Sequence, residues 1–182
     1  MSAKDSSVKH TKRIVIAALA AAAALSTIAF AQDGSVFAPE PKAPVDRSQD
    51  AAWQNQQTLA LAKLRWQDGW RVLPHGLRWR PISGDGSGTH PTVQDTVALH
   101  YEGRLVDGTV FDSSYERGQP AAFPLARLIP AWQMAVPQMG IGDTIEIAVP
   151  ADLGYGPEGN DTIPGGATLF FKIELLAIRG KE

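Results

Sequence analysis

The chain has 182 residues, of which 44% are hydrophobic, and this suffices for one ordinary globular core with a short additional segment. The formal net charge is −2, and no run of Lys and Arg outside the extreme N-terminus suggests a nucleic-acid-binding surface. The sequence contains no cysteine, which excludes disulfide bonds, thiolate catalysis and thiolate metal sites.

Residues 1–31 have the pattern of a secretory signal peptide. Four basic residues precede the apolar run Ile14–Ala31, which ends in the small-x-small sequence Ala29-Phe30-Ala31 before polar Gln32. The alternative is an uncleaved anchor in the inner membrane, facing the periplasm. The run has 18 residues and is rich in alanine, so it is near the lower limit for a spanning helix and inserts weakly. Cleavage after Ala31, with release into the periplasm, is therefore favoured.

The next segment, residues 32–47, is predicted to be a linker. It contains Pro39, Pro41 and Pro44, which are incompatible with a helix or a central strand.

Residues 48–72 are predicted to form an N-terminal helical extension, with a helix beginning near Ser48 and ending near Gln67, before Gly69. One apolar stripe at roughly helical spacing is formed by Trp53, Ala60, Leu61 and Leu64. A stripe of this kind packs on its own domain, on a second copy of the chain or on another partner, and the pattern does not choose among them.

From Gly76 onward the hydrophobic period changes from helical to alternating. Period-2 patterns rich in β-branched and aromatic residues predict half-buried antiparallel strands. The strands are expected in GLRWRPI, DTVALHYEG, DTIEIAVP and TLFFKIELLAI. Asp107-Gly108 predicts a hairpin turn, and Pro130 and Pro137 leave room only for a short helix between them. The fold class is therefore α+β, with an antiparallel sheet wrapped over one short helix.

No residue pattern predicts metal, nucleotide or covalent chemistry. The four histidines are isolated, and His100 is best interpreted as a packed strand residue. The sequence GDGSG, residues 84–88, lacks the lysine and hydroxyl residue of a phosphate loop and is predicted to be a turn. No cofactor is expected.

Several ordered blocks resemble the FKBP-type peptidyl-prolyl cis–trans isomerases. The blocks are HYEGRLVDGTVFDSSYERGQP, FPLARLIPAWQMAVPQMGIGD, IAVPADLGYG and IPGGATLFFKIELL, and the resemblance runs from about Leu73 to Ile178. The arrangement is similar to the secreted bacterial members that carry a helical N-terminal extension. The resemblance implies an isomerase domain over residues 73–182, with a five- to six-stranded half-barrel around a short helix and a proline-binding pocket between them.

The same resemblance implies the residues of that pocket. The catalytic set would be Tyr101, Asp112 and Tyr155, with the Tyr155 hydroxyl donated to the substrate and Asp112 beside the carbonyl of the rotating bond. Trp132 would form the floor under the proline ring, and the Ile129 N–H would bind a substrate carbonyl. The substrate-binding set would be Phe111, Arg117, Phe123, Leu128, Ile129, Trp132, Ile163 and Phe171.

The sequence departs from the family pattern in three places. Ala131 stands before Trp132, where glycine is usual, and Ala121-Ala122 occupy a position that is aromatic in some members. Gly165-Gly166 follow Pro164, where a proline or asparagine is common, and this predicts a looser loop. The departures bear on substrate preference more than on activity.

The resemblance implies that the chain catalyses X–Pro isomerisation in unfolded or partly folded polypeptides. It also implies macrolide inhibitors as ligands, and it favours a homodimer through the N-terminal helix. The alternative is a periplasmic holdase chaperone or scaffold that binds prolyl segments without turnover. No nucleic-acid partner is expected, because residues 32–182 carry 13 Lys and Arg against 18 Asp and Glu.

Overall fold

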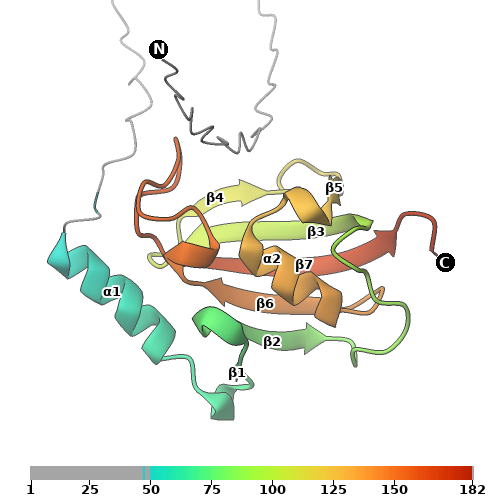
Figure 1. Cartoon of the computed structure of the whole chain (residues 1–182), viewed down its shortest axis with the longest axis horizontal. Coiled ribbons are helices and arrows are strands. Elements are labelled where there is room, and N and C mark those ends of the chain that lie inside the picture. The colour runs from blue at the N-terminus through green and yellow to red at the C-terminus, as the bar shows by residue number, and fades with distance from the viewer. Residues whose placement is uncertain (1–46, 48–49, 182) are drawn as a thin grey trace, which may run out of the picture. The chain divides into compact units, whose positions relative to one another are not determined.

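The computed structural model describes Arg47 and residues 50–181 (Figure 1). The predicted signal peptide, and almost all of the predicted linker, lie outside the described residues.

The first element is helix α1, Ala51–Ala62, which is shorter at both ends than the sequence predicted. Asp50 rather than Ser48 is the N-cap, and its carboxylate accepts a hydrogen bond from the Trp53 N–H at 3.1 Å. After the helix, Arg65 adopts an extended backbone, and a single 3-10 turn ends at Gly69 with φ of 87°. The extended backbone at Arg65 prevents the helix from reaching its predicted limit at Gln67.

Seven antiparallel strands form one sheet in the described part of the chain. They are β1 Arg71–Val72, β2 Arg78–Ser83, β3 Thr96–Leu105, β4 Val110–Ser113, β5 Ala121–Pro124, β6 Thr144–Val149 and β7 Leu169–Ile178. The order is β1-β2-β6-β7-β3-β4, and β5 also pairs with β3. The count exceeds the predicted five to six because the two-residue β1 extends one edge, and two residues are too few to produce an alternating pattern.

Strand β3 organises the sheet around the candidate site. Its side chains alternate between buried and half-buried along most of its length, as the sequence predicted. Its register places Tyr101 opposite Ile173 and Gly103 opposite Phe171 of β7. The predicted hairpin after β3 is confirmed, because β3 and β4 are antiparallel and Gly108 in the turn has φ of 88°. Tyr101 and Phe171 consequently lie on the same face of adjacent strands.

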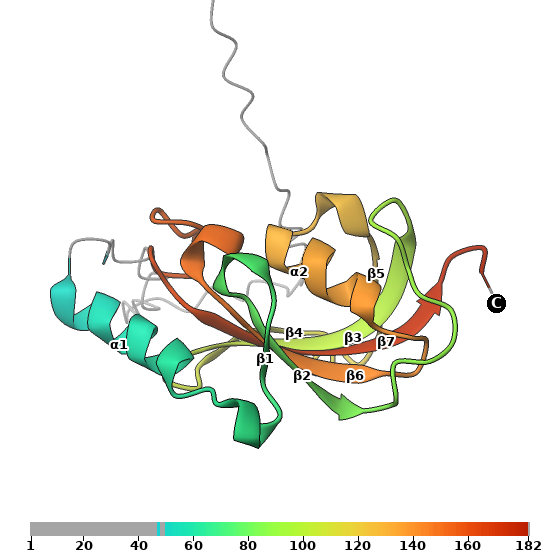
Figure 2. The same ribbon diagram turned by 60° about the horizontal axis from the view of Figure 1, so that its bottom comes forward.

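Helix α2, Pro130–Ala135, lies across one face of the curved sheet (Figure 2). Pro130 occupies the first turn, where a missing N–H costs no helical hydrogen bond. Ala131, Trp132 and Ala135 are buried against the sheet. The predicted sheet wrapped over a short helix is therefore confirmed.

The opposite face of the sheet carries a cluster of charged side chains around one buried carboxylate. Glu146 in β6 is only 6% exposed, and its carboxylate accepts hydrogen bonds from Arg80 Nη2 at 2.7 Å and Nε at 2.9 Å. Arg104 of β3 pairs with the other carboxylate oxygen. The Arg80 guanidinium also stacks over the Trp70 ring at 4.9 Å. One buried carboxylate thus joins β2, β6 and β3 across the sheet.

Helix α1 packs on its own domain through the face of the predicted stripe, but only the first half of that face is buried. Trp53 is 8% exposed and belongs to the single hydrophobic core. The second buried residue is Gln57, whereas Leu61 and Leu64 are only half-buried. A polar residue can occupy the buried face because its side chain bonds to the backbone of Thr168.

Candidate active site

Five aromatic rings from five elements form one continuous cluster on the α2 side of the sheet. The Trp132 ring meets Tyr101 and Phe171 nearly edge-on, at centroid distances of 5.4 and 5.3 Å. Phe111 extends the cluster beyond Phe171 at 5.6 Å, and Phe123 extends it beyond Tyr101 at 6.1 Å. Edge-to-face contacts of this kind favour one fixed arrangement of the rings. The structure therefore brings the predicted floor, Trp132, together with the other aromatic rings predicted for the site, and Phe111 and Phe123 are only half-buried at the outer ends.

Three polar side chains beside the aromatic cluster are bonded to one another. The Tyr101 hydroxyl donates to Asp112 Oδ2 at 2.5 Å, and Arg117 pairs with Asp112 Oδ1. Arg117 Nη2 in turn donates to the Tyr101 hydroxyl oxygen at 2.8 Å. Each of the three side chains is thus bonded to the other two, which fixes the orientation of the carboxylate. The side chains of Asp112 and Arg117 remain 42% and 44% exposed, so this carboxylate lies at the solvent-facing edge of the cluster.

Both tyrosines of the site hold their protons far above neutral pH. Burial raises the pKa of Tyr101 to about 12, with a further contribution from the hydrogen bond to Asp112 that Arg117 partly opposes. Burial also raises the pKa of Tyr155, and the negative charge of Asp112 acts in the same direction. Asp112 therefore lies close enough to Tyr155 for their charges to interact. Both hydroxyls are donors at physiological pH.

Donors around the cluster lack acceptors in the described part of the chain. The Trp132 indole N–H is buried without a partner. No hydrogen bond of the described residues uses the Ile129 N–H or the Tyr155 hydroxyl as donor. A buried donor without an acceptor costs free energy, and such groups in native proteins commonly mark a site for a ligand or for water.

The remaining predicted residues surround the same core. Ile129 is 6% exposed and caps α2, where its carbonyl accepts hydrogen bonds from the N–H groups of Trp132 and Gln133. Ile163 is 2% exposed and belongs to the core cluster, and Leu128 packs against that cluster while remaining half-buried.

Comparisons with known proteins identify the family of the chain. Residues 87–176 match a family model described as FKBP-type peptidyl-prolyl cis-trans isomerase. The chain is 46% identical to peptidyl-prolyl cis-trans isomerase FKBP15-1 of Arabidopsis thaliana over 68% of its own length and 80% of that protein. It also matches the crystal structure of a peptidyl-prolyl cis-trans isomerase from Pseudomonas syringae with a TM-score of 0.64 and 32% identity, over 70% of this chain and 93% of that one. The chain belongs to the FKBP-type peptidyl-prolyl cis-trans isomerase family.

The match to longer bacterial FKBP-type proteins is partial. The chain is 45% identical to peptidyl-prolyl cis-trans isomerase Mip of Coxiella burnetii, over 62% of this chain and 49% of that protein. The chain thus spans about half the length of this curated relative.

Gly103 is a residue of the candidate site that the sequence reasoning missed. A Cβ at this position would lie 2.6 Å from the Phe111 ring and 2.8 Å from the Phe171 ring. The two rings can therefore approach each other only because β3 has no side chain here. A glycine inside an otherwise alternating strand was the available signal, since it often marks a close approach of another group.

Ser114 is a second missed residue. It is fully buried, and its Oγ accepts the Tyr101 backbone N–H at 2.7 Å while also contacting His100 Nδ1 at 3.0 Å. Ser114 therefore fixes the backbone that carries the Tyr101 hydroxyl. His100 lies in β3 and stacks on Tyr115 at 4.7 Å, which confirms its interpretation as a packed strand residue. No sequence pattern distinguished Ser114 from a surface serine.

The prediction of a looser loop at Gly165-Gly166 is wrong. A Cβ on Gly165 would lie 2.1 Å from the Pro157 carbonyl oxygen, and a Cβ on Gly166 would lie 2.5 Å from Gln54 Nε2. Gly165 is thus packed tightly against this carbonyl, and Gly166 has a φ of 72°, a conformation that other residues rarely adopt. A second departure, Ala131, is fully buried in α2.

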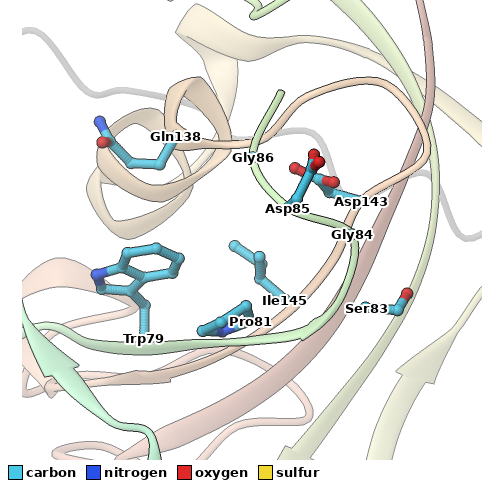
Figure 3. A pocket seen from close by; sticks show the side chains of 9 residues that line it. All are labelled: Trp79, Pro81, Ser83, Gly84, Asp85, Gly86, Gln138, Asp143 and Ile145. Carbon is cyan, nitrogen blue, oxygen red and sulfur yellow. The ribbon is translucent and has the colours of Figure 1, made fainter. Parts of the chain in front are cut away.

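A separate cavity of about 150 Å³ lies away from this site (Figure 3). Trp79, Pro81 and Ile145 line its apolar side, and Asp85 and Asp143 lie at the other. Its lining shares no residue with the predicted FKBP site. The turn predicted at residues 84–88 is confirmed, with positive φ at Gly84, Gly86 and Gly88. Figure 3 thus shows a surface feature of the β2 turn rather than part of the aromatic cluster.

Neither a metal centre nor a membrane span occurs within the described residues. Among Arg47 and residues 50–181, no group of three or more His, Cys, Asp and Glu side chains could hold a metal ion. In the same part of the chain, no helix has both the length and the apolar character needed to cross a membrane.

Proposed function

We propose that the chain is a peptidyl-prolyl cis–trans isomerase that accelerates rotation about X–Pro bonds in unfolded or partly folded polypeptides. The observation that carries this proposal is the aromatic cluster around Trp132, closed on one side by the Tyr101–Asp112–Arg117 contacts. The family supports the reaction type. The cluster supplies the surroundings that this reaction requires.

The barrier to X–Pro rotation arises from amide resonance. Resonance keeps the bond planar and gives a barrier of about 20 kcal/mol. The twisted transition state has lost that resonance, and its carbonyl is less dipolar. An apolar environment therefore disfavours the planar amide more than the twisted one. The buried rings of Trp132, Tyr101 and Phe171, each 4–5% exposed, provide such an environment for the proline ring.

The polar groups act on the two sides of the same bond. The unpaired Ile129 N–H and Tyr155 hydroxyl are donors that hold the peptide in a bent pose through its carbonyls. The fixed carboxylate of Asp112 lies beside the rotating carbonyl and disfavours the negative charge that resonance places on its oxygen. An acceleration of about 10⁵-fold requires about 7 kcal/mol of differential stabilisation of the transition state. The apolar surroundings, the hydrogen bonds to the peptide carbonyls and the Asp112 charge supply this amount together. No metal or nucleophile takes part in the proposed mechanism.

The holdase alternative requires only an apolar surface. The holdase alternative gives no role to the hydrogen bonds that Asp112 forms with Tyr101 and Arg117, or to the protonated Tyr155 hydroxyl. These features favour turnover over simple binding. A chaperone contribution from the helical extension is compatible with turnover, and macrolides that present a ring in place of proline would compete for the same cluster.

The proposed location is the periplasm, with cleavage after Ala31. The apolar run Ile14–Ala31 and its small-x-small end support this location. Cell fractionation followed by N-terminal sequencing tests it. A soluble periplasmic species beginning at Gln32 is expected, whereas a membrane-bound species that retains residues 1–31 would show the anchored alternative.

A homodimer through α1 is the proposed assembly. Leu59 is 56% exposed, and with Leu64, Phe170 and Val106 it lines a groove of about 600 Å³ beside the helix. Light scattering at tens of micromolar tests the assembly, because a monomeric mass would leave α1 with intradomain packing alone.

The proposed activity is tested by X–Pro exchange in a peptide. Exchange NMR of a short Leu-Pro peptide measures the interconversion rate at several protein concentrations. An isomerase raises the rate in proportion to its concentration. A holdase broadens the peptide signals by binding without raising the rate, and that result would replace the proposal by the alternative.

A further inference from the structure

The segment that joins the β6 side of the sheet to β7 carries two of the site residues. We call residues 154–168 the site loop. It contains Tyr155 near its beginning and Ile163 near its middle, and it has no regular secondary structure. A segment of this length without helix or strand holds its side chains in place only through specific contacts.

Hydrogen bonds to two residues of α1 hold the end of the site loop. The Trp53 indole N–H donates to the Gly165 carbonyl oxygen at 3.1 Å, in a buried position. One helical turn later, the Gln57 side-chain oxygen accepts the Thr168 N–H at 2.8 Å. The residues Trp53 and Gln57, which we call the α1 clamp, are 8% and 4% exposed. The helix therefore bonds to the loop backbone on both sides of Ala167.

The clamped end of the loop is bonded directly to the segment that carries Tyr155. The Gly166 N–H donates to the Gly156 carbonyl oxygen at 3.0 Å, and Gly156 is the neighbour of Tyr155. Gly165 also packs against Pro157 so closely that a Cβ would lie 2.1 Å from the Pro157 carbonyl oxygen. A displacement of Gly165 or Gly166 would thus be transmitted to the backbone beside Tyr155.

The chemistry of Gln57 suggests more than packing. Its Nε2 group is buried and has no partner among the described residues. Burial of an unpaired amide N–H costs free energy, and an apolar side chain would fill the same space without that cost. The feature that an apolar residue would lack is the acceptor for the Thr168 N–H.

We propose that Trp53 and Gln57 are positioning residues, and that the helical extension holds Tyr155 and Ile163 in place through the site loop. The proposal rests on the proposed isomerase function for its effect on rate. It assigns to α1 a direct part in the site of its own chain, whatever the assembly state.

The first test compares three single variants with the purified wild-type protein. Trp53→Phe keeps the ring but removes the indole donor, and Gln57→Met removes the acceptor at similar length. Trp66→Phe is the matched control, because Trp66 is 70% exposed and lies outside the clamp. Each clamp variant should lower kcat/KM for a Leu-Pro peptide about tenfold, since small displacements of catalytic groups are costly. Trp66→Phe should retain the wild-type value.

The second test asks whether Trp53 acts through Tyr155. In a double-mutant cycle, Trp53→Phe should reduce kcat/KM much less in the Tyr155→Phe background than in the wild type, because interacting residues are not additive. Fully additive losses would contradict the proposal. A full retention of kcat/KM by folded Trp53→Phe and Gln57→Met would contradict it as well.

The third test does not depend on activity. Titration of ¹³Cζ-tyrosine NMR signals reports each hydroxyl separately. A loosened site loop exposes Tyr155, so its pKa should fall towards the ordinary value in both clamp variants while that of Tyr101 stays unchanged. A wild type without isomerase activity would refute the proposed function and leave this titration to decide the positioning. An unchanged Tyr155 titration in both folded clamp variants would refute the positioning.

Discussion

Gly103 shows how one absent side chain shapes the site. The Phe111 and Phe171 rings occupy the space in which a Cβ would stand. Gly103→Ala should separate these rings and lower both isomerase activity and stability, the latter by about 1–3 kcal/mol as for other overpacked cores. Urea unfolding and the X–Pro exchange assay measure the two effects. Wild-type values in both would mean that the rings move aside freely and do not form a fixed wall.

Tyr101 should make the protein sensitive to alkali. Its pKa is raised to about 12 in the folded state against 10.0 for the free side chain, so the folded state retains a proton that the unfolded state loses. The contribution is complete below pH 10 and is lost as the pH rises towards 12. The unfolding free energy should therefore fall over that range, and less steeply in Tyr101→Phe. Equal slopes for both proteins, in urea unfolding at a series of pH values, would show that Tyr101 titrates normally.

The site residues were predicted because they occur in family order within longer blocks, and the structure brings their rings together. Trp132, Phe171 and Tyr101 have no pattern of their own that separates a site residue from a core residue. Ser114 was missed for that reason, because its role depends on a backbone N–H opposite it and not on neighbouring letters. The looser loop predicted at Gly165-Gly166 was wrong because glycine indicates either freedom or close packing, and only tertiary contacts decide between them.

At the scale of elements, alternating patterns predicted the long strands well. β3 and β7 each show the expected burial of every second residue. β6 does not, because all six of its residues are buried and Glu146 faces the outer side. Its partners Arg80 and Arg104 come from distant parts of the sequence, so no local pattern indicated that the carboxylate would be enclosed.

The Glu146 contacts should stabilise the sheet without affecting catalysis. Glu146→Ala removes the buried partner of two arginines and should cost about 1–3 kcal/mol, as for hydrogen bonds to charged groups. Glu102→Ala is the matched control, because its side chain is 34% exposed and lies 3.7 Å from Arg104. An exposed pair of this kind should contribute only about 0–1 kcal/mol.

Both variants, Glu146→Ala and Glu102→Ala, should retain wild-type kcat/KM, because the charges lie on the face of the sheet opposite the aromatic cluster. Urea unfolding and the exchange assay provide the two measurements. Equal destabilisation by the two substitutions would show that burial of Glu146 adds nothing to its ion pairs.

At the scale of the whole molecule, the predicted division at residue 73 separates segments that the structure joins. Trp53 of the extension belongs to the same hydrophobic core as Trp132 and Phe171. The sequence showed an apolar stripe on a helix but could not identify the surface that covers it, because no pattern elsewhere in the chain marks the surface on which such a stripe packs. The covering surface includes the site loop, so the extension and the isomerase domain form one structural unit around the site.

The most direct test of the account is the rate of X–Pro exchange in wild type and in the double variant Asp112→Ala, Tyr155→Phe. Both side chains lie at the edge of the cluster, so the double variant should remain folded, which the near-ultraviolet circular dichroism spectrum checks. The account predicts strong acceleration by wild type and a large loss of kcat/KM in the folded double variant. Wild-type acceleration by that folded variant would contradict the proposed mechanism, because neither the Asp112 carboxylate nor the Tyr155 hydroxyl would then be needed for catalysis.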